Sequence, residues 1–276
     1  MGAVIALSTL GIDAFDNRSD ISGSLLGSVI GAGQKDRSLC PQGMSYVQHP
    51  EKSFCIDTYT ASAGEDCPYQ DPKTQEETRM NILSSECGAV SEKGRVPWRY
   101  VSQAQAREVC RTRGKYLVSV KEWYTAAQGT PSVESKVVSD DDCNINGNWL
   151  SEDPGPTGSG GKCVSGVGVY DMVGNVWEWV DGTVINGEFE GLKLPPEGYV
   201  TAVNESGVPI STDLNDPDPN YGGDEFWLKD EGASGIMRGG FYGSGNSAGI
   251  YAFHAQMEPS FAGRAVGFRC ASETLR

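Results

Sequence analysis

The sequence predicts an α+β domain in which much of the chain is irregular. Two segments carry helix-capping patterns, and the other apolar segments are short and strand-like. Glycine and proline, which favour turns, account for 36 and 14 of the 276 residues. Few strands, two helices and long loops together indicate an α+β fold whose surface is mostly loop.

The N-terminal third is expected to contain an arm, a hairpin and a loop. Residues 1–38 are rich in Gly, Ser and Ala, which predicts an N-terminal arm or attachment segment ahead of a domain at 39–276. Residues 44–62 alternate apolar and polar side chains around a charged turn, as in a β-hairpin. Residues 63–98 are polar and hold two cysteines, which predicts a long loop closed by a disulfide.

Two helices are marked by capping boxes, in which Ser and a Gln or Glu three residues later satisfy each other's backbone N–H groups. Ser102 and Gln105 open the first helix, which we expect to end at Gly114. Ser119 and Glu122 open the second, which a Gly-Thr-Pro sequence ends. These are the only helices that the sequence marks clearly, and part of residues 1–38 could also be helical.

The rest of the domain divides into loops and short strands. Residues 135–165 and 186–232 are rich in Gly, Pro, Asp and Asn and are expected to be loops. The remaining apolar segments predict strands at 167–180, 236–242, 248–255 and 265–271.

Charge and composition exclude several classes of protein. The formal charge is −15, from 22 Lys and Arg against 37 Asp and Glu, which argues against binding to nucleic acid. No apolar run is long enough for a transmembrane helix. His49 and His254 are the only histidines, so three-histidine metal sites are excluded.

Eight cysteines are dispersed over the chain without a C-x-x-C pair. An even, dispersed set favours disulfides and an oxidising compartment, although free buried thiols remain an alternative and eight thiols allow 105 connectivities. Residues 1–15 lack the basic start of a signal peptide. Either the chain is trimmed or it leaves the cell by another route, such as release with a virus particle.

The densest motif is GVYDMVGNVWEW at 168–179. Asp171 and Glu178 are hard oxygen ligands that a tight turn at 174–175 would bring together, and the carbonyls of Gly174 and Val176 could complete a calcium shell. In the alternative interpretation, this is a buried turn whose acids accept backbone N–H groups. The acidic loop at 140–146 offers further oxygens.

Several blocks occur in a fixed order: GKYL, EWYTAA, YDMVGNVWEW, RGG and GFRCA, at 114–117, 122–127, 170–179, 238–240 and 267–271. In this order the chain resembles the formylglycine-generating enzyme (sulfatase-modifying factor) family over about residues 40–271. The resemblance implies a C-type-lectin-like fold with two helices, short twisted antiparallel strands and long loops.

The resemblance also implies particular site residues. Structural calcium would be held at positions matching Asp171, Gly174, Val176 and Glu178, with a second site near Asn144 and Ile145. The family disulfide would join Cys110 to Cys270, and Cys143 and Cys163, which flank a loop, would form a second pair.

Family enzymes oxidise a substrate cysteine with copper held by two thiolates between the RGG and GFRC blocks, and soft thiolates are what Cu(I) requires. Here residues 241–269 contain no cysteine. The sequence therefore predicts the scaffold without the enzyme chemistry. An oxidase or other metal-dependent enzyme of the family remains the alternative.

The stretch from the RGG block to the GFRC block more closely resembles the variable proteins of diversity-generating retroelements. In those proteins adenine-directed mutagenesis rewrites a C-terminal segment, which here would be about residues 238–271. Changing the adenines of an Asn codon yields Phe, Tyr, Ser, Gly, Asn, His, Ala or Arg, but never Gln, Met, Glu, Lys or Trp. The candidate variable positions hold reachable residues. They are Phe241, Gly243, Ser244, Asn246, Ser247, Tyr251, His254, Phe261, Gly263 and Arg264.

The leading hypothesis is a non-enzymatic protein that displays a diversified binding site on a lectin-like scaffold. Tyr, Ser, Gly and Asn mixed with other aromatics is also the composition of antibody paratopes. The expected partner is a protein or glycan on a cell surface, and the expected location is extracellular, on a virion or on a microbial surface. A purely structural virion subunit is a third interpretation, and the sequence leaves oligomerisation open.

Overall fold

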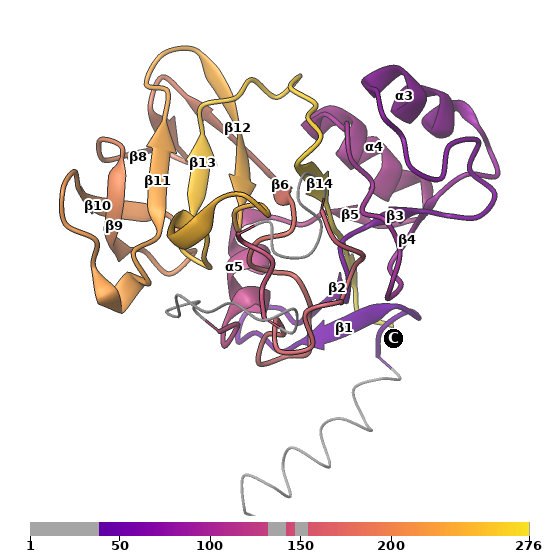
Figure 1. Cartoon of the computed structure of the whole chain (residues 1–276), viewed down its shortest axis with the longest axis horizontal. Helices are drawn as coiled ribbons and strands as arrows, with labels where there is room; N and C mark the ends of the chain where they lie inside the picture. The colour runs from indigo at the N-terminus through magenta and orange to yellow at the C-terminus, as the bar shows by residue number, and fades with distance from the viewer. Residues whose placement is uncertain (1–38, 132–141, 147–153, 276) are drawn as a thin grey trace, which may run out of the picture.

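A strongly curled nine-stranded sheet forms the larger part of the domain in the computed structural model, and a smaller sheet and three helices lie beside it (Figure 1). The structure describes residues 39–131, 142–146 and 154–275. The arm predicted at 1–38 and parts of the loop predicted at 135–165 lie outside these ranges. Helices and mainly antiparallel sheets occur together in the described residues, which agrees with the predicted α+β class.

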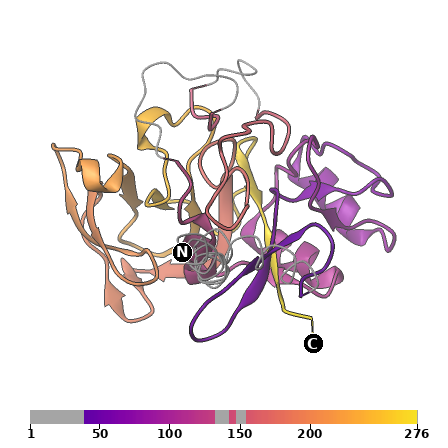
Figure 2. The same cartoon turned by 90° about the horizontal axis from the view of Figure 1, so that it is seen from below.

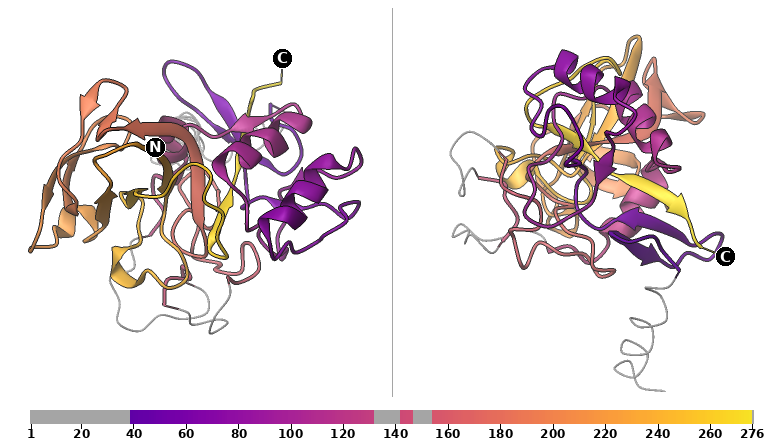
Figure 3. Two further views of the ribbon diagram at one scale, coloured as in Figure 1. Left: turned by 90° about the horizontal axis from the view of Figure 1, so that it is seen from above. Right: turned by 90° about the vertical axis from the view of Figure 1, so that its right-hand side faces the viewer.

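The large sheet has the order β10-β9-β11-β13-β12-β6-β7-β8, and β14 also pairs with β6. In Figure 2 and in the left view of Figure 3, its orange β9–β10 hairpin lies at the opposite side of the molecule from the purple helix α3. The strands are β6 (Trp177–Ile185), β7 (Glu188–Phe189), β8 (Leu192–Lys193), β9 (Gly198–Val203), β10 (Pro209–Asp213), β11 (Glu225–Leu228), β12 (Ala233–Arg238), β13 (Phe253–Ala255) and β14 (Val266–Phe268).

The smaller sheet carries the two ends of the described domain. Its order is β1-β2-β15-β5, formed by Met44–Val47, Phe54–Asp57, Cys270–Glu273 and Tyr116–Leu117. The β1–β2 pair is the hairpin predicted from the alternation at 44–62. A separate two-stranded sheet joins β3 (Ser62–Ala63) to β4 (Ala89–Val90).

Both predicted helices are confirmed. Helix α4 (Gln103–Thr112) and helix α5 (Val120–Ala127) each begin with the expected reciprocal capping box. Each is followed by a glycine with positive φ, as a helix C-terminus favours.

The prediction that 63–98 is only a loop was wrong. Helix α3 (Gln75–Leu83) lies within it, capped by the Thr74 hydroxyl, which accepts the Glu77 N–H. The Thr-x-x-Glu pattern was present in the sequence, but the helix buries only Thr78 and Asn81 and so lacks the apolar stripe that would have identified it. The predicted disulfide across this stretch is present as Cys67–Cys87.

Two strand predictions also needed correction. Residues 186–232 hold strands β7 to β11 in addition to loop, because several of these strands are short or lie at the exposed edge of the sheet and show little apolar alternation. The strands are not all antiparallel: β11 pairs with β13, and β14 pairs with β6, in parallel. In each parallel pair, the residues between the two strands are numerous enough to form the crossover connection that parallel pairing requires.

The interior contains two principal clusters of buried apolar side chains. One gathers around Trp123, Val180 and Phe226, between helix α5 and the large sheet. The other gathers around Trp98, Trp179 and Phe268, beneath helix α4. The strands that border the predicted variable segment, β12 and β14, therefore rest on a fully buried support.

Candidate functional site

The motif at 170–178 forms a tight turn before strand β6, as the sequence suggested. Gly174 and Asn175 adopt φ of 75° and 60°, the left-handed conformation that a tight turn requires. A side chain at position 174 is excluded, because a Cβ there would lie 2.3 Å from the carbonyl oxygen of Asn144. The turn is thus packed directly against residues 144–145.

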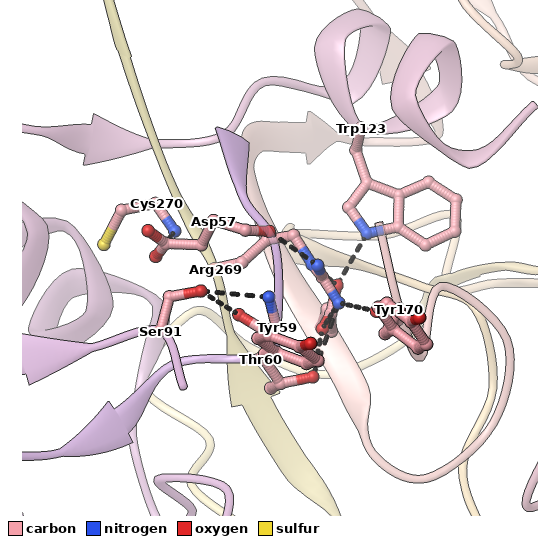
Figure 4. Close-up of polar contacts among 9 residues, drawn as sticks. Asp57, Tyr59, Thr60, Ser91, Trp123, Tyr170, Arg269 and Cys270 are labelled. Carbon is pink, nitrogen blue, oxygen red and sulfur yellow. Dashed lines mark hydrogen bonds and ion pairs between the residues drawn. The ribbon is translucent and has the colours of Figure 1, made fainter. Parts of the chain in front are cut away.

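Glu178, which follows this turn, is the centre of a buried polar network. Figure 4 labels its partners Thr60, Trp123 and Arg269. The Arg269 guanidinium donates to both carboxylate oxygens of Glu178, at 2.7 Å each. The Trp123 Nε1 and the Thr60 hydroxyl donate to the same carboxylate at 2.8 and 2.9 Å. Arg269 also donates to the carbonyls of Asp57 and Tyr170. We call these contacts the Arg269 network.

The network changes the prediction for calcium. The Glu178 carboxylate already accepts four donors, and its charge is compensated by an arginine at the same depth, so it does not fit a calcium shell. The calcium role predicted for Glu178 therefore stays a prediction that this arrangement supports poorly. Of the two interpretations of this motif, the geometry agrees better with the buried turn, although the donors to Glu178 are side chains rather than the backbone N–H groups expected.

Asp171 is also buried, with φ of 59°. One of its oxygens accepts the Gly158 N–H, and burial raises the pKa of its carboxyl to about 6. With Glu178 neutralised, Asp171 is the only charged oxygen left in the predicted set. Calcium affinity depends on the number of charged ligands, so calcium at Asp171, Gly174 and Val176 stays a prediction that this donor set supports poorly.

The second predicted metal position, Asn144 and Ile145, serves as a brace in this structure. The carbonyl of Asn144 accepts the Asn175 N–H at 2.7 Å, and the carbonyl of Ile145 accepts the Gly245 N–H at 2.8 Å. The Asn144 side-chain oxygen is buried without a hydrogen-bond partner among the described residues. In the described ranges no three His, Cys, Asp or Glu side chains gather into a metal-binding group.

All eight cysteines lie in described residues, and all are paired. Two of the bridges, Cys110–Cys270 and Cys143–Cys163, are the pairs expected from the sequence. The other two join Cys40 to Cys55 and Cys67 to Cys87. No thiol in the chain is therefore free to bind a metal or to react.

The chain between β12 and β14, residues 239–265, is attached to its surroundings mainly through its own backbone. Backbone N–H or C=O groups of residues 242, 245, 257, 259, 263 and 265 bond to backbone groups of residues 175, 145, 235, 103, 100 and 177 respectively. These bonds do not depend on the identity of the side chains in the segment. Its position is therefore fixed largely by main-chain contacts with the scaffold.

The side chain of Arg238 also holds the backbone of this segment. Its guanidinium donates to the backbone carbonyls of Ala252 and Ile250, at 3.0 and 2.8 Å. It lies over the rings of Trp123 and Phe253, at 4.9 and 5.1 Å, and burial lowers its pKa to about 9.

On the other side of the segment, the buried Asp224 carboxylate accepts the Tyr251 N–H at 2.8 Å. Burial raises the pKa of this carboxyl to about 7. A framework arginine and a framework aspartate thus hold the backbone of residues 250–252 from two directions.

Four of the candidate variable residues line one cavity of about 260 Å³, together with framework residues. Strands β11 and β13 place Trp227 directly beside His254, and β6 contributes Trp177. The three rings lie 5.5 to 5.7 Å apart. We call this cavity the aromatic cup; its lining residues are Trp177, Trp227, Phe241, Ser244, Ser247, His254 and Gln256.

The other six candidate residues lie outside the cup. Gly243 and Asn246 are exposed beside it. Tyr251 faces a second cavity, where its ring packs against those of Tyr124 and Tyr221. Because its ring packs against two framework tyrosines, Tyr251 contributes more to the packing of the scaffold than its place among the candidate variable residues suggested.

Phe261, Gly263 and Arg264 lie on the connection from β13 to β14, which passes close to helix α4 (Figure 1). Phe261 is 38% exposed, and the Arg264 side chain is also exposed. The structure thus distributes the ten candidates over a cup, a second cavity and this connection.

Sequence reasoning did not identify Trp227 or Gln256 as part of the cup. Trp227 stands in the stretch predicted as loop, and Gln256 was noted only as a residue outside the reachable set. The adjacent aromatic residues of EFWL, which favour strands, were the available signal for β11, which lies between β9 and β13 in the large sheet.

Comparison with known families decides the affiliation of the chain. Residues 32–274 match the model of the sulfatase-modifying factor enzyme 1-like domain. The chain belongs to this family. The match covers nearly all of the described domain, and it includes the Arg269 network and the aromatic cup.

Among solved structures, this family member is similar to the Major Tropism Determinant I1 variant, with 16% identity, a TM-score of 0.44 and 86% of the chain covered. The chain spans only 54% of that protein's length. PvdO from Pseudomonas aeruginosa is 18% identical, with a TM-score of 0.44 and coverage of 80% and 81%.

Treponema denticola variable protein 1 is 14% identical, with a TM-score of 0.40 and coverage of 85% and 100%. No curated protein matches the chain significantly.

Proposed function

We propose that this family member is a non-enzymatic binding protein whose segment at 238–271 is diversified and displays the ligand-binding surface, as in a variable protein of a diversity-generating retroelement. The observation that carries the proposal is the way the segment is held. The backbone of residues 239–265 is attached by main-chain bonds to the scaffold, by Arg238 of strand β12 and by Asp224, while candidate side chains reach the cup and the surface.

This arrangement separates folding from recognition. A substitution at Ser247 or His254 leaves the attachments made by Arg238 and Asp224 in place. Loop positions such as Ser247 accept many side chains, because a surface loop on a rigid support carries little of the folding free energy. His254 lies in strand β13, where its side chain lines the cup. One exception is Ser244, whose hydroxyl accepts the Phe241 N–H at 3.0 Å.

The pairing of the cysteines supports the non-enzymatic part of the proposal. A bis-thiolate copper site needs two free cysteines, and each of the eight is in a disulfide. The four disulfides also support an extracellular location, on a virion or a cell surface. None of the helices in the described ranges has the length and apolarity of a membrane span.

The proposed partner is a protein or a glycan on a cell surface. The names of two similar structures, a tropism determinant and a variable protein, agree with such a role. Because the chain matches only about half of the tropism determinant, the assignment of a partner rests on the proposal alone.

Sequencing the same locus in independent isolates tests the diversification. We expect substitutions to concentrate at the ten candidate positions and to match adenines in a nearby, near-identical copy of the 3′ coding segment. The matched control is the β9–β10 hairpin, whose residues are also mostly intermediate or exposed but lie outside the segment. Substitutions spread evenly over both regions, without such a copy, would contradict the proposal.

An activity assay tests the enzyme alternative. The protein is loaded with copper, and oxygen uptake is followed with a cysteine-containing peptide. We expect no turnover above that of copper alone. Turnover that is lost on His254→Ala would overturn the non-enzymatic assignment.

A further inference from the structure

The aromatic cup combines residues of two kinds. Phe241, Ser244, Ser247 and His254 are candidate variable residues, whereas the tryptophans come from β6 and β11, outside the segment. Trp and Gln also cannot arise from an Asn codon by changes at its adenines. The cup therefore has a constant aromatic floor beneath a replaceable rim.

A constant floor restricts what the cup can bind, whatever the rim. We propose that it receives a cationic side chain, a lysine ammonium or an arginine guanidinium, of the protein partner. This inference rests on the proposed function and specifies the chemistry of its ligand.

The rings provide the first argument. Trp177 and Trp227 lie 5.6 Å apart with perpendicular planes, and His254 lies 5.5 and 5.7 Å from them. Tryptophan faces attract cations more strongly than other aromatic faces do, and partial desolvation increases the attraction. Burial lowers the pKa of His254 to about 4, so its ring is uncharged at neutral pH and does not repel a cation.

The surrounding charges provide the second argument. Neither lysine nor arginine lines the cup. At its rim the Ser247 hydroxyl is bonded to the Glu225 carboxylate at 2.8 Å, and Gln256 donates to Glu197 at 2.9 Å. Both acids would favour a cation over an anion or a neutral sugar.

An adjoining cavity of about 590 Å³ continues this acidic surface. It shares Gln256 with the cup and is lined by Glu197 and Asp230, with Lys229 as its single basic residue. A chain that places one basic side chain in the cup would thus continue over a surface of net negative charge. The charge of −15 for the whole molecule acts in the same direction at longer range.

The test compares side chains that differ mainly in charge. N-acetyllysine methylamide and N-acetylarginine methylamide are titrated into the protein by calorimetry, with N-acetylnorleucine methylamide as the uncharged analogue and ionic strength held constant. We expect both cations to bind about tenfold more tightly than norleucine. Trp227→Ala should abolish the difference, and Trp227→Phe should retain part of it.

Tyr69→Ala is the control, because this side chain is exposed on the stretch closed by Cys67–Cys87, is not part of the cup and contributes only its backbone to the hydrogen bonds with Asn81. It should bind as the wild type does, and thermal unfolding should show that all variants are folded. Equal binding of norleucine and lysine would show an apolar pocket and overturn the proposal. Binding of methyl glycosides without binding of the cations would show a sugar site and also overturn it.

Failure of this inference and failure of the proposed function are distinguishable. If isolates vary at the rim but the tryptophan floor shows no preference for cations, only the ligand class is wrong. If the floor prefers cations while isolates do not vary within the segment, the cup stands and the diversified function fails.

Discussion

The Arg269 network and the aromatic cup both lie next to strand β6, and they use side chains in opposite ways. In the network each polar group that meets Glu178 is buried and paired, so the side chains themselves determine the structure. In the cup the backbone is paired, and several ring faces and hydroxyls line open space. Side chains that fix the fold and side chains that are free to bind are thus only a few residues apart.

The pairing of strands β14 and β6 shows how close the Arg269 network and the aromatic cup are. Gly267 pairs with Glu178 across β14 and β6, while the preceding residue, Val266, pairs with Trp177 of the cup floor. The alternation of side chains along β6 directs Glu178 into the network and Trp177 into the cup. One strand therefore serves both the interior and the binding surface.

Breaking the network should have the largest effect. Arg269→Met leaves the Glu178 carboxylate buried without its counter-charge, and we expect the free energy of unfolding to fall by about 3–5 kcal/mol. Chemical denaturation measures the loss. Arg107→Met is the matched control, because its partner Asp181 is exposed, and it should cost less than about 1 kcal/mol. Similar losses in the two variants would show that the network does not carry the stability assigned to it.

Asp224 gives a test of the contact between scaffold and segment. Its folded pKa of about 7 lies above the unfolded value, so the folded state retains a proton that the unfolded state has lost, and stability falls as pH rises from about 4 to about 7. In Asp224→Asn this contribution is absent.

The difference in unfolding free energy between Asp224→Asn and the wild type should therefore shift in favour of the variant over that range. With the pKa raised from 3.8 to about 7, the shift is on the order of 4 kcal/mol, and the difference should be constant well above pH 7. A difference that does not depend on pH would mean that Asp224 is ionised throughout. Tyr251 and Arg238 are the groups that face this carboxylate.

Changes at the rim of the cup should affect stability little. Phe241→Tyr, Ser247→Asn and His254→Tyr, combined, are expected to alter the unfolding free energy by less than about 1.5 kcal/mol, because the attachments of the segment are in its backbone. Urea titration measures this value. A loss as large as that of Arg269→Met would contradict the contrast between the two regions.

Calcium chelation should have the smallest effect. Because Glu178 is neutralised by Arg269, we expect an excess of EDTA to change the melting temperature by less than about 1 °C. A decrease of several degrees that added calcium reverses would restore the calcium prediction, with Asp171 as its charged ligand.

The parts of the fold that the sequence predicted are those governed by local rules. The capping boxes at Ser102 and Ser119 and the alternation at 44–62 need only neighbouring residues, and they predicted α4, α5 and the first hairpin. Helix α3 and the strands of 186–232 were missed because neighbouring tertiary structure stabilises them more than an apolar pattern of their own.

The candidate site was predictable to a similar degree. Fixed motifs on either side marked the segment, and the composition between them indicated binding. Which of its residues share a cavity depends on pairings between distant strands, such as Trp227 with His254, and no local pattern in the sequence encodes these. For the same reason the sequence did not show that Glu178 pairs with Arg269, which lies 91 positions away.

Strands β13 and β14 are both held in the large sheet, β13 by β11 and β12 and β14 by β6, so the two ends of the connection at 256–265 have fixed positions. The entropy of closing such a loop grows only slowly with its length, by about 0.6 kcal/mol for each doubling. Insertions near Phe261 would therefore extend the chain outward without shifting either strand. The same surface can then be reshaped by loop length as well as by residue identity.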